Sequence, residues 1–176
     1  MKYGTISYLF SNGKLLMIKK LVRENDPNSG FYVSPGGKLE SFEKGVNIKG
    51  RLESVIREIK EETGLELINP KLKGIILFDN FERVFENWKN SEDFLVYVFS
   101  CERYKGRLKK KSDEGIPMWV DEHKIKDLPQ NEGDKKMYEW IKKGKPFVGV
   151  IKHKDKSLDE QGTFVDALNN SPYYKS

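Results

Sequence analysis

One amphipathic segment, residues 52–64, sets the strongest constraint on the fold of this chain. Its apolar residues stand at positions 52, 55, 56 and 59, which is helical spacing, and Gly64 follows them as a residue that favours the end of a helix. Runs with strand character lie on both sides of this segment. The order of elements is strands, a helix, several strands, a late helix and a strand, which predicts a mixed α+β fold.

The strand and turn signals divide the rest of the chain. The first two predicted strands, 3–10 and 14–20, meet at Asn12-Gly13, which is a strong hairpin signal. A late helix is predicted over 134–143 from apolar residues at 137, 140 and 141, and a short helical turn over 121–127. The other predicted strands are 31–33, 72–78, 94–101, 107–109, 118–120 and 147–153, whereas 21–30 and 38–51 have the composition of loops.

The composition fits one folded domain. A chain of 176 residues is long enough for one core, and 12% aromatic residues argue against disorder. No apolar run approaches the roughly 18 residues that a membrane helix needs, so we expect no membrane partner. We expect the domain to span residues 1–153 and a polar tail over 154–176 to be only partly ordered.

Charge and cysteine content indicate the compartment and the partners. The single cysteine, Cys101, cannot form an internal disulfide, and the N-terminus has no signal-peptide pattern, so a cytoplasmic location is expected. The net charge of +5 suits a polyphosphate ligand as well as a nucleic acid. We interpret the basic clusters 105–111 and 142–145 as solvated faces, which disfavours a nucleic-acid partner. Cys101 is expected to pack within a strand, and both histidines, His123 and His153, are expected to lie on the surface. The chain is expected to be a monomer or a homodimer.

Three glutamates stand close together on the predicted helix. Glu58, Glu61 and Glu62 are related by i, i+3 and i+4, so they project from about one face. Such like charges repel one another, and Arg57 offsets this only in part. Three convergent carboxylates suit a hard divalent cation such as Mg²⁺. The segment REIKEE alone would equally suit a solvated helix with Glu–Lys pairs, so the wider pattern has to decide.

The wider pattern resembles the Nudix box, G-x5-E-x7-R-E-U-x-E-E-x-G-U, where U is a bulky apolar residue. One departure is visible: counting forward from Gly37 puts the first motif glutamate at Glu43, whereas counting back from Arg57 puts it at Lys49. The loop of the box therefore carries a six-residue insertion between Glu43 and the helix. The resemblance implies a Nudix fold, in which a mixed sheet lies between the box helix and the late helix. The matching residues are Gly37, Arg57, Glu58, Ile59, Glu61, Glu62, Gly64 and Leu65.

Two segments outside the box resemble enzymes that hydrolyse oxidised purine nucleoside triphosphates. Residues 112–119 match the pattern S-D-E-x-x-P-x-W, which implies that Glu114 lies near the metals. Residues 131–134 precede the late helix in the same way, which implies that Glu132 and Asp134 line the base pocket. Structural roles are the alternative here, with Trp119 in the core and Asp134 as a helix cap.

The resemblance implies hydrolysis of a nucleoside triphosphate to a nucleoside monophosphate and pyrophosphate, with Mg²⁺ or Mn²⁺ as cofactor. Oxidised purine nucleotides such as 8-oxo-dGTP are the expected small-molecule substrates. The implied catalytic residues are Glu58 as general base, Arg57 as the group that orients the carboxylates, and Glu61. The implied metal ligands are Gly37, Glu58, Glu61, Glu62 and Glu114, and the implied substrate-binding residues are Lys19, Tyr32, Lys38, Glu132 and Asp134.

Three other functions stay open. ADP-ribose hydrolases of this family usually carry a proline a little beyond the box, and none occurs between Lys71 and Ile116. Hydrolysis of RNA 5′ ends is a second possibility. The third is a nucleotide-binding module without catalysis, but such relatives typically lose box glutamates, and all three helix glutamates are present here.

Overall fold

A computed structural model describes residues 2–24, 26, 28–39, 48–79, 93–154 and 157–167. The helices within these ranges are α1 (Ile48–Thr63), the 3₁₀ helix η1 (Glu122–Asp127) and α2 (Glu132–Lys142). The strands are β1 (Lys2–Ser11), β2 (Lys14–Lys20), β3 (Tyr32–Val33), β4 (Gly36–Lys38), β5 (Leu65–Leu67), β6 (Lys71–Asp79), β7 (Phe94–Cys101), β8 (Tyr104–Gly106), β9 (Gly115–Asp121), β10 (Phe147–Lys154), β11 (Ser157–Leu158) and β12 (Phe164–Ala167).

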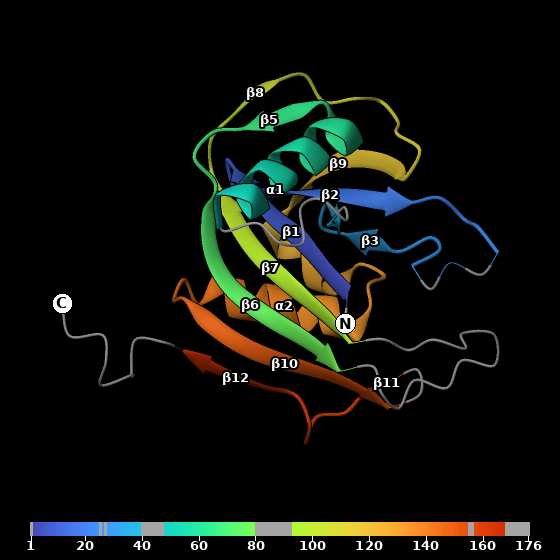
Figure 1. Ribbon diagram of the computed structural model, residues 1–176. Helices are drawn as coiled ribbons and strands as arrows, with labels where there is room; N and C mark the ends of the chain where they lie inside the picture. Colours follow the sequence, from blue (N-terminus) through green and yellow to red (C-terminus); the bar gives the residue numbers. More distant parts are fainter. Residues whose placement is uncertain are drawn as a thin grey trace.

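A mixed sheet forms the centre of the molecule, in the order β11-β10-β6-β7-β1-β2-β3. Strand β1 runs parallel to β7 and antiparallel to β2, while β6 runs antiparallel to β7 and parallel to β10. Strands β4, β9 and β12 join this sheet by pairing with β1, β2 and β10. The two long helices, α1 and α2, lie on opposite faces of it (Figure 1). The predicted α+β architecture, with a sheet between the box helix and the late helix, is confirmed.

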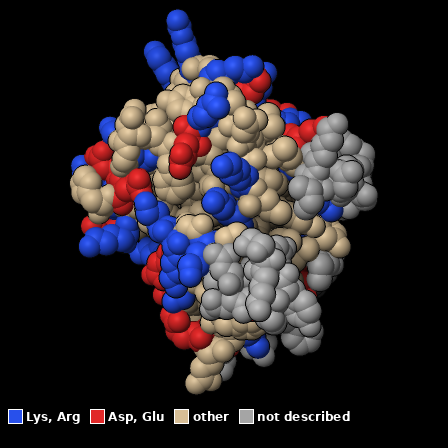
Figure 2. Space-filling model, turned by 90° about the vertical axis from the view of Figure 1, so that its left-hand side faces the viewer, with Lys and Arg blue, Asp and Glu red and all other residues tan. Residues whose placement is uncertain are grey.

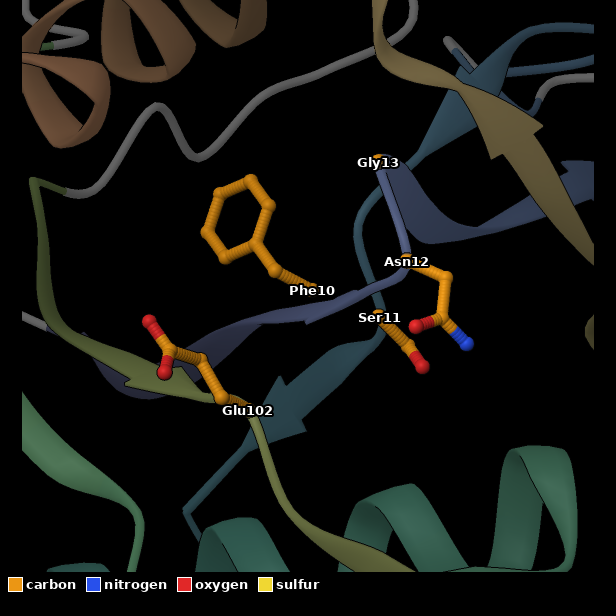
Figure 3. Close-up of a pocket in the computed structure, with 5 residues that line it drawn as sticks. All are labelled: Phe10, Ser11, Asn12, Gly13 and Glu102. Atoms are coloured by element: carbon orange, nitrogen blue, oxygen red, sulfur yellow. The ribbon is translucent and has the colours of Figure 1, made fainter.

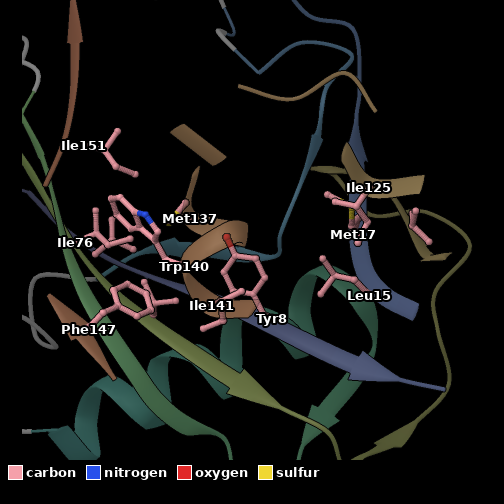
Figure 4. Close-up of a cluster of buried hydrophobic side chains, with 13 residues drawn as sticks. Tyr8, Leu15, Met17, Ile76, Ile125, Met137, Trp140, Ile141, Phe147 and Ile151 are labelled. Carbon is pink, nitrogen blue, oxygen red and sulfur yellow. The ribbon is translucent and has the colours of Figure 1, made fainter. Parts of the chain in front are cut away.

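Alternating side chains of β1 and β2 separate the core into two clusters. Tyr8 and Leu15 face α2, whereas the next residues, Leu9 and Leu16, face α1. The cluster on the α2 side includes Trp140 and the strand residues drawn with it in Figure 4. Because each helix has its own buried cluster, the sheet holds both helices in fixed positions relative to β1 and β2.

Local geometry explains where the box helix ends. Thr63 Oγ1 donates a hydrogen bond to Ile59 O at 2.6 Å and accepts one from Leu65 N at 3.1 Å. Gly64 then adopts a φ of +80°, which a residue with a side chain rarely takes. The helix starts earlier than predicted, at Ile48. The expectation of a loop over 38–51 is therefore wrong for residues 48–51, which are helical, and for Lys38, which belongs to β4.

Two further expectations are wrong. Residues 107–109 are not a strand; the strand in this region is β8, which pairs with the unpredicted β5. The chain leaves β8 at Gly106, where φ is +100°, and then runs beside the end of α1, with Lys109 N donating to Thr63 O at 2.8 Å. A three-residue strand has too few alternating positions to be distinguished from a loop in the sequence.

His153 is buried, with 4% of its surface exposed, so its predicted surface position is wrong. It stands two residues after Ile151 on β10, on the face that α2 covers, and its ring stacks on Phe78 with centroids 6.4 Å apart. Gly133 of α2 makes room for it, because a Cβ there would lie 3.1 Å from His153 Cε1. The prediction for His123 is confirmed, since that residue is exposed.

Cys101 is buried in β7, as predicted, and its Sγ lies 3.3 Å from Ile68 O and 3.1 Å from Arg103 O. In the tail, β11 and β12 both pair with β10, so residues 157–167 contribute to the sheet. No helix in the part of the chain that the structure describes is long and apolar enough to cross a membrane.

The basic cluster 105–111 is solvated, as predicted. Lys105 is exposed and pairs with Glu66 at 2.8 Å, and Lys60 pairs with the same carboxyl group at 3.1 Å. These two lysines lower the pKa of Glu66 through their hydrogen bonds. On the face drawn in Figure 2, acidic side chains likewise accompany the basic ones along one side of the molecule.

Candidate active site

The box brings Gly37 and Glu58 into direct contact. Gly37 lies on β4, opposite Thr5 of β1, and Glu58 lies on the turn of α1 above it. A Cβ at Gly37 would lie 2.5 Å from Glu58 Cδ, which is far inside van der Waals distance. Only glycine therefore lets the carboxylate of Glu58 rest against the backbone of β4.

Glu62, one helical turn further along, is held by the preceding glycine. Gly36 N donates a hydrogen bond to Glu62 Oε2 at 3.0 Å. Burial raises the pKa of Glu62 to about 8; the Gly36 amide opposes this rise, and the charges of Glu58 and Glu114 add to it. Three carboxylates, Glu58, Glu62 and Glu114, therefore act on one another at this point.

Arg57 binds two of the box glutamates at once. Its Nη2 lies 2.8 Å from Glu58 Oε1, and its Nη1 lies 3.1 Å from Glu61 Oε2. The first contact fits the predicted role of Arg57 in orienting a carboxylate. Glu61 is directed outward by the second contact, and 60% of its side chain is exposed. The structure thus brings the predicted ligand Glu61 to Arg57 and not to the carboxylate of Glu62.

Glu114 reaches the site from the residue just before β9. Strand β9 pairs with β2 in a register that places Gly115 opposite Lys20. A Cβ at Gly115 would lie 2.8 Å from Ile18 Cγ2, so glycine permits this close approach of the two strands. Glu114 Oε2 accepts a hydrogen bond from Lys20 Nζ, and only 15% of the Lys20 side chain is exposed.

Lys20 is a site residue that the sequence analysis missed. The prediction named its neighbour Lys19, but Lys19 is exposed and lies over the ring of Tyr32, with Nζ 5.8 Å from the ring centroid. Neighbouring residues of a strand point to opposite faces, so only one of the two lysines can face the carboxylates. The pairing register with β9 decides which one, and no local pattern in β2 carries that information.

The donor set fits a hard divalent cation. Carboxylate oxygens from two elements converge at a partly buried position, which is the ligand chemistry that Mg²⁺ and Mn²⁺ accept. As they stand, the His, Cys, Asp and Glu side chains within the described ranges include no group of three arranged to hold a metal ion. Two of the carboxylates are instead paired with basic side chains, Glu58 with Arg57 and Glu114 with Lys20.

A second polar cluster lies between β1 and α2. Tyr8 is fully buried, and its hydroxyl is hydrogen-bonded to Ser34. Burial, followed by the nearby charge of Asp134, raises the pKa of Tyr8 well above its usual value. Tyr138 of α2 stands 6.3 Å from Tyr8 between ring centroids. Asp134, predicted for the base pocket, therefore lies beside a buried tyrosine in the first turn of α2.

The other predicted substrate-binding residues have contacts of their own. Glu132 Oε2 accepts a hydrogen bond from Leu158 N at 2.7 Å, so it ties α2 to β11. Tyr32 is half-buried against the α2-side core, with its N donating to Pro129 O at 2.8 Å. Lys38 is exposed on β4. Glu43 lies outside the described residues.

Trp119, predicted for the core, is partly buried beside Tyr104 on the α1 side, with ring centroids 5.3 Å apart.

A pocket of about 240 Å³ opens at the β1–β2 turn and is lined by Phe10, Ser11, Asn12, Gly13 and Glu102 (Figure 3). None of the predicted site residues lines that pocket.

Comparison with known proteins agrees with this geometry. The sequence model of the NUDIX domain matches residues 3–141, which is most of the chain. This protein belongs to the Nudix family. An uncharacterized Nudix hydrolase of Bacillus subtilis, YvcI, is 33% identical to it over 138 residues, which is 77% of this chain and 76% of YvcI. The chain is therefore a Nudix hydrolase.

Solved structures of other Nudix proteins share the fold. A mutator MutT protein from Bacillus halodurans has a TM-score of 0.74 and 27% identity, covering 94% of this chain and 98% of the other. The NUDIX domain of Shewanella oneidensis NrtR, solved with ADP ribose, has a TM-score of 0.62 and 12% identity, covering 81% of this chain and 86% of the other, and is alike in fold alone. An ADP-ribose pyrophosphatase of Methanocaldococcus jannaschii is 42% identical over 65 residues, which is 37% of this chain and 31% of that protein.

Proposed function

We propose that this Nudix hydrolase is a metal-dependent nucleoside triphosphate pyrophosphohydrolase that prefers oxidised purine nucleotides such as 8-oxo-dGTP. The observation that carries the hydrolytic half of the proposal is the convergence of Glu58, Glu62 and Glu114 beside the glycines of β4. The resemblance of residues 112–119 and 131–134 to enzymes that hydrolyse oxidised purine nucleoside triphosphates supports a triphosphate substrate, and the fold is shared with the Bacillus halodurans MutT protein. The cytoplasm is the proposed compartment, and one copy of the chain supplies every group named here.

Glu58, Glu62 and Glu114 would hold Mg²⁺ or Mn²⁺, with Gly37 at the same site and Glu61 at its exposed side. A bound divalent ion neutralises phosphate charge and lowers the pKa of a coordinated water. Glu58 is the proposed general base, because Arg57 fixes its carboxylate through a contact of 2.8 Å. The water oxygen bonds to phosphorus, its proton passes to Glu58, and the phosphoanhydride bond breaks to release pyrophosphate with the bonding electron pair.

Lys38, exposed on β4 next to Gly37, is the proposed phosphate-binding group, whereas Lys19 points to the other face of β2 and lies over Tyr32. For the base, we assign recognition to Asp134 and stacking to Tyr32. Oxidation at C8 of a purine adds a carbonyl and turns N7 from an acceptor into a donor. An ionised aspartate accepts only, and a protonated one also donates, so a carboxyl group can distinguish the two purine edges. Glu132 has less scope for this role because it already accepts the Leu158 N–H.

A turnover panel tests the proposal. The measurement is kcat/KM for 8-oxo-dGTP, dGTP, 2-hydroxy-dATP and ADP-ribose, with Mg²⁺ and with a chelator. We expect turnover only with metal and a higher kcat/KM for 8-oxo-dGTP than for dGTP. Equal values for these two substrates would refute the preference for oxidised purines and leave the hydrolase in place.

ADP-ribose is the second candidate substrate. The segment shared with the Methanocaldococcus jannaschii ADP-ribose pyrophosphatase favours it, although that match covers only 37% of this chain. A clear preference for ADP-ribose in the same panel would establish this alternative.

A further inference from the structure

Lys20 is the one basic side chain of β2 that lies largely buried against the carboxylate cluster. Its side chain is 15% exposed, whereas that of its partner Glu114 is 43% exposed. The charge of Lys20 also reaches Glu62, whose pKa it lowers. One ammonium group therefore acts on two of the carboxylates that would hold the metal.

The turn that carries Glu114 is fixed by contacts that do not involve the side chain of Lys20. Ser112 N donates to Gly115 O at 2.8 Å, which closes the turn, and Arg23 donates from its guanidinium to Asp113 O. The seven paired positions between β2 and β9 hold the strand that follows. Lys20 is thus not needed to build the turn, and its buried charge calls for another explanation.

An ammonium group and a divalent metal ion compete for the same carboxylate oxygens. While Lys20 pairs with Glu114, those oxygens are partly neutralised, and the positive charge nearby repels a second cation. We propose that Lys20 is a built-in counter-ion of the metal site, which holds Glu114 in the metal-free enzyme and gives it up when the metal binds. The inference rests on the proposed function, because it takes Glu114 as part of a metal site. Lys20 is in this sense a residue that tunes metal affinity.

The chain offers a matched control for this lysine. Lys14, at the other end of β2, also forms an ion pair with an acidic residue of β9, Asp121, at 3.6 Å. The Lys14 side chain is more exposed than that of Lys20, 47% against 15%, and its pair stands at the far end of the same two strands. Lys14→Met and Lys20→Met remove the same charge from the same strand, and only one of them does so at the carboxylate cluster.

The test is a titration of the metal-free protein with Mn²⁺, without nucleotide, in which free Mn²⁺ is measured by electron paramagnetic resonance. We expect Lys20→Met to bind Mn²⁺ about tenfold more tightly than wild type, since it loses a like charge near the ion. Lys14→Met and Lys20→Arg should match wild type. Glu114→Gln should bind Mn²⁺ more weakly, so the two halves of one ion pair should shift the affinity in opposite directions.

A folded Lys20→Met variant whose Mn²⁺ affinity equals or falls below that of wild type overturns the inference. If wild type binds no Mn²⁺, the proposed metal-dependent function is overturned as well. The failure of this inference and the failure of the proposed function are therefore distinguishable. If Lys20→Met does not fold, NMR of the labelled lysine side chains in wild type replaces it. Saturating Mg²⁺ should then shift the Lys20 ε-methylene signal and leave that of Lys14 in place, and an unshifted Lys20 signal contradicts the inference.

Discussion

The carboxylate site on α1 and the polar cluster beside α2 are built from different kinds of contact. At the first, glutamate side chains meet the backbone of Gly36 and Gly37, so the partners have no side chains to adjust. At the second, the side chain of Ser34 is hydrogen-bonded to Tyr8, and the charge of Asp134 acts on the same tyrosine. Backbone contacts keep the reacting groups in fixed positions, whereas side-chain contacts can change with single substitutions. Hydrolysis should therefore depend on the first region and substrate choice on the second.

The largest effect on turnover is expected at the carboxylate site, from the loss of the proposed general base. Glu58→Gln keeps the shape of the side chain and removes its charge, so kcat should fall about 10²- to 10⁴-fold while the melting temperature stays near that of wild type. Glu53→Gln, on an exposed position of the same helix, serves as the control. Near wild-type turnover by Glu58→Gln would remove this residue from the reaction.

Gly37→Ala tests whether the backbone contact matters. The added Cβ would press on the Glu58 carboxyl group and displace it by a sizeable fraction of an ångström or more. A misplaced catalytic group of this kind can cost about 100-fold, so kcat/KM should drop for every nucleotide in the panel alike. A change in the ratio between substrates, with kcat preserved, would instead place Gly37 in substrate selection.

Much of the first region could be predicted from the sequence, because it depends on spacing along one helix and on two glycines. The positions of Gly37, Arg57 and Glu58 follow from that spacing, and they do meet. Lys20 could not be found in this way, since its place depends on the register that puts it opposite Gly115. The burial of His153 likewise follows from the packing of α2 on β10, and the outward direction of Glu61 from its contact with Arg57. A local sequence pattern thus carries no information about contacts between distant segments.

The second region is tested by Asp134→Asn. The amide replaces a carboxyl oxygen with a donor group, so the preference for 8-oxo-dGTP over dGTP should fall by roughly tenfold, as expected for the loss of one buried hydrogen bond. The kcat for dGTP should change little, because the carboxylates on α1 are untouched. Glu139→Gln, exposed on the same helix, is the control. An equal loss for both substrates would show that Asp134 supports the fold rather than the choice of base.

The smallest effect concerns the pH dependence of stability in the metal-free protein. Burial raises the pKa of Glu62 from 4.5 to about 8, so between these values the folded state keeps a proton that the unfolded state has lost. Since the folded state binds more protons there, this group stabilises the fold fully below pH 4.5, and its contribution is lost as the pH rises to about 8. Melting curves with a chelator should show a melting temperature that falls by several degrees from about pH 5 to pH 8. Glu62→Gln cannot lose that proton, so its melting temperature should fall less over the same range. Identical pH profiles for the two proteins would mean that Glu62 is ionised in the folded, metal-free state, and that the Gly36 amide and Lys20 outweigh its burial.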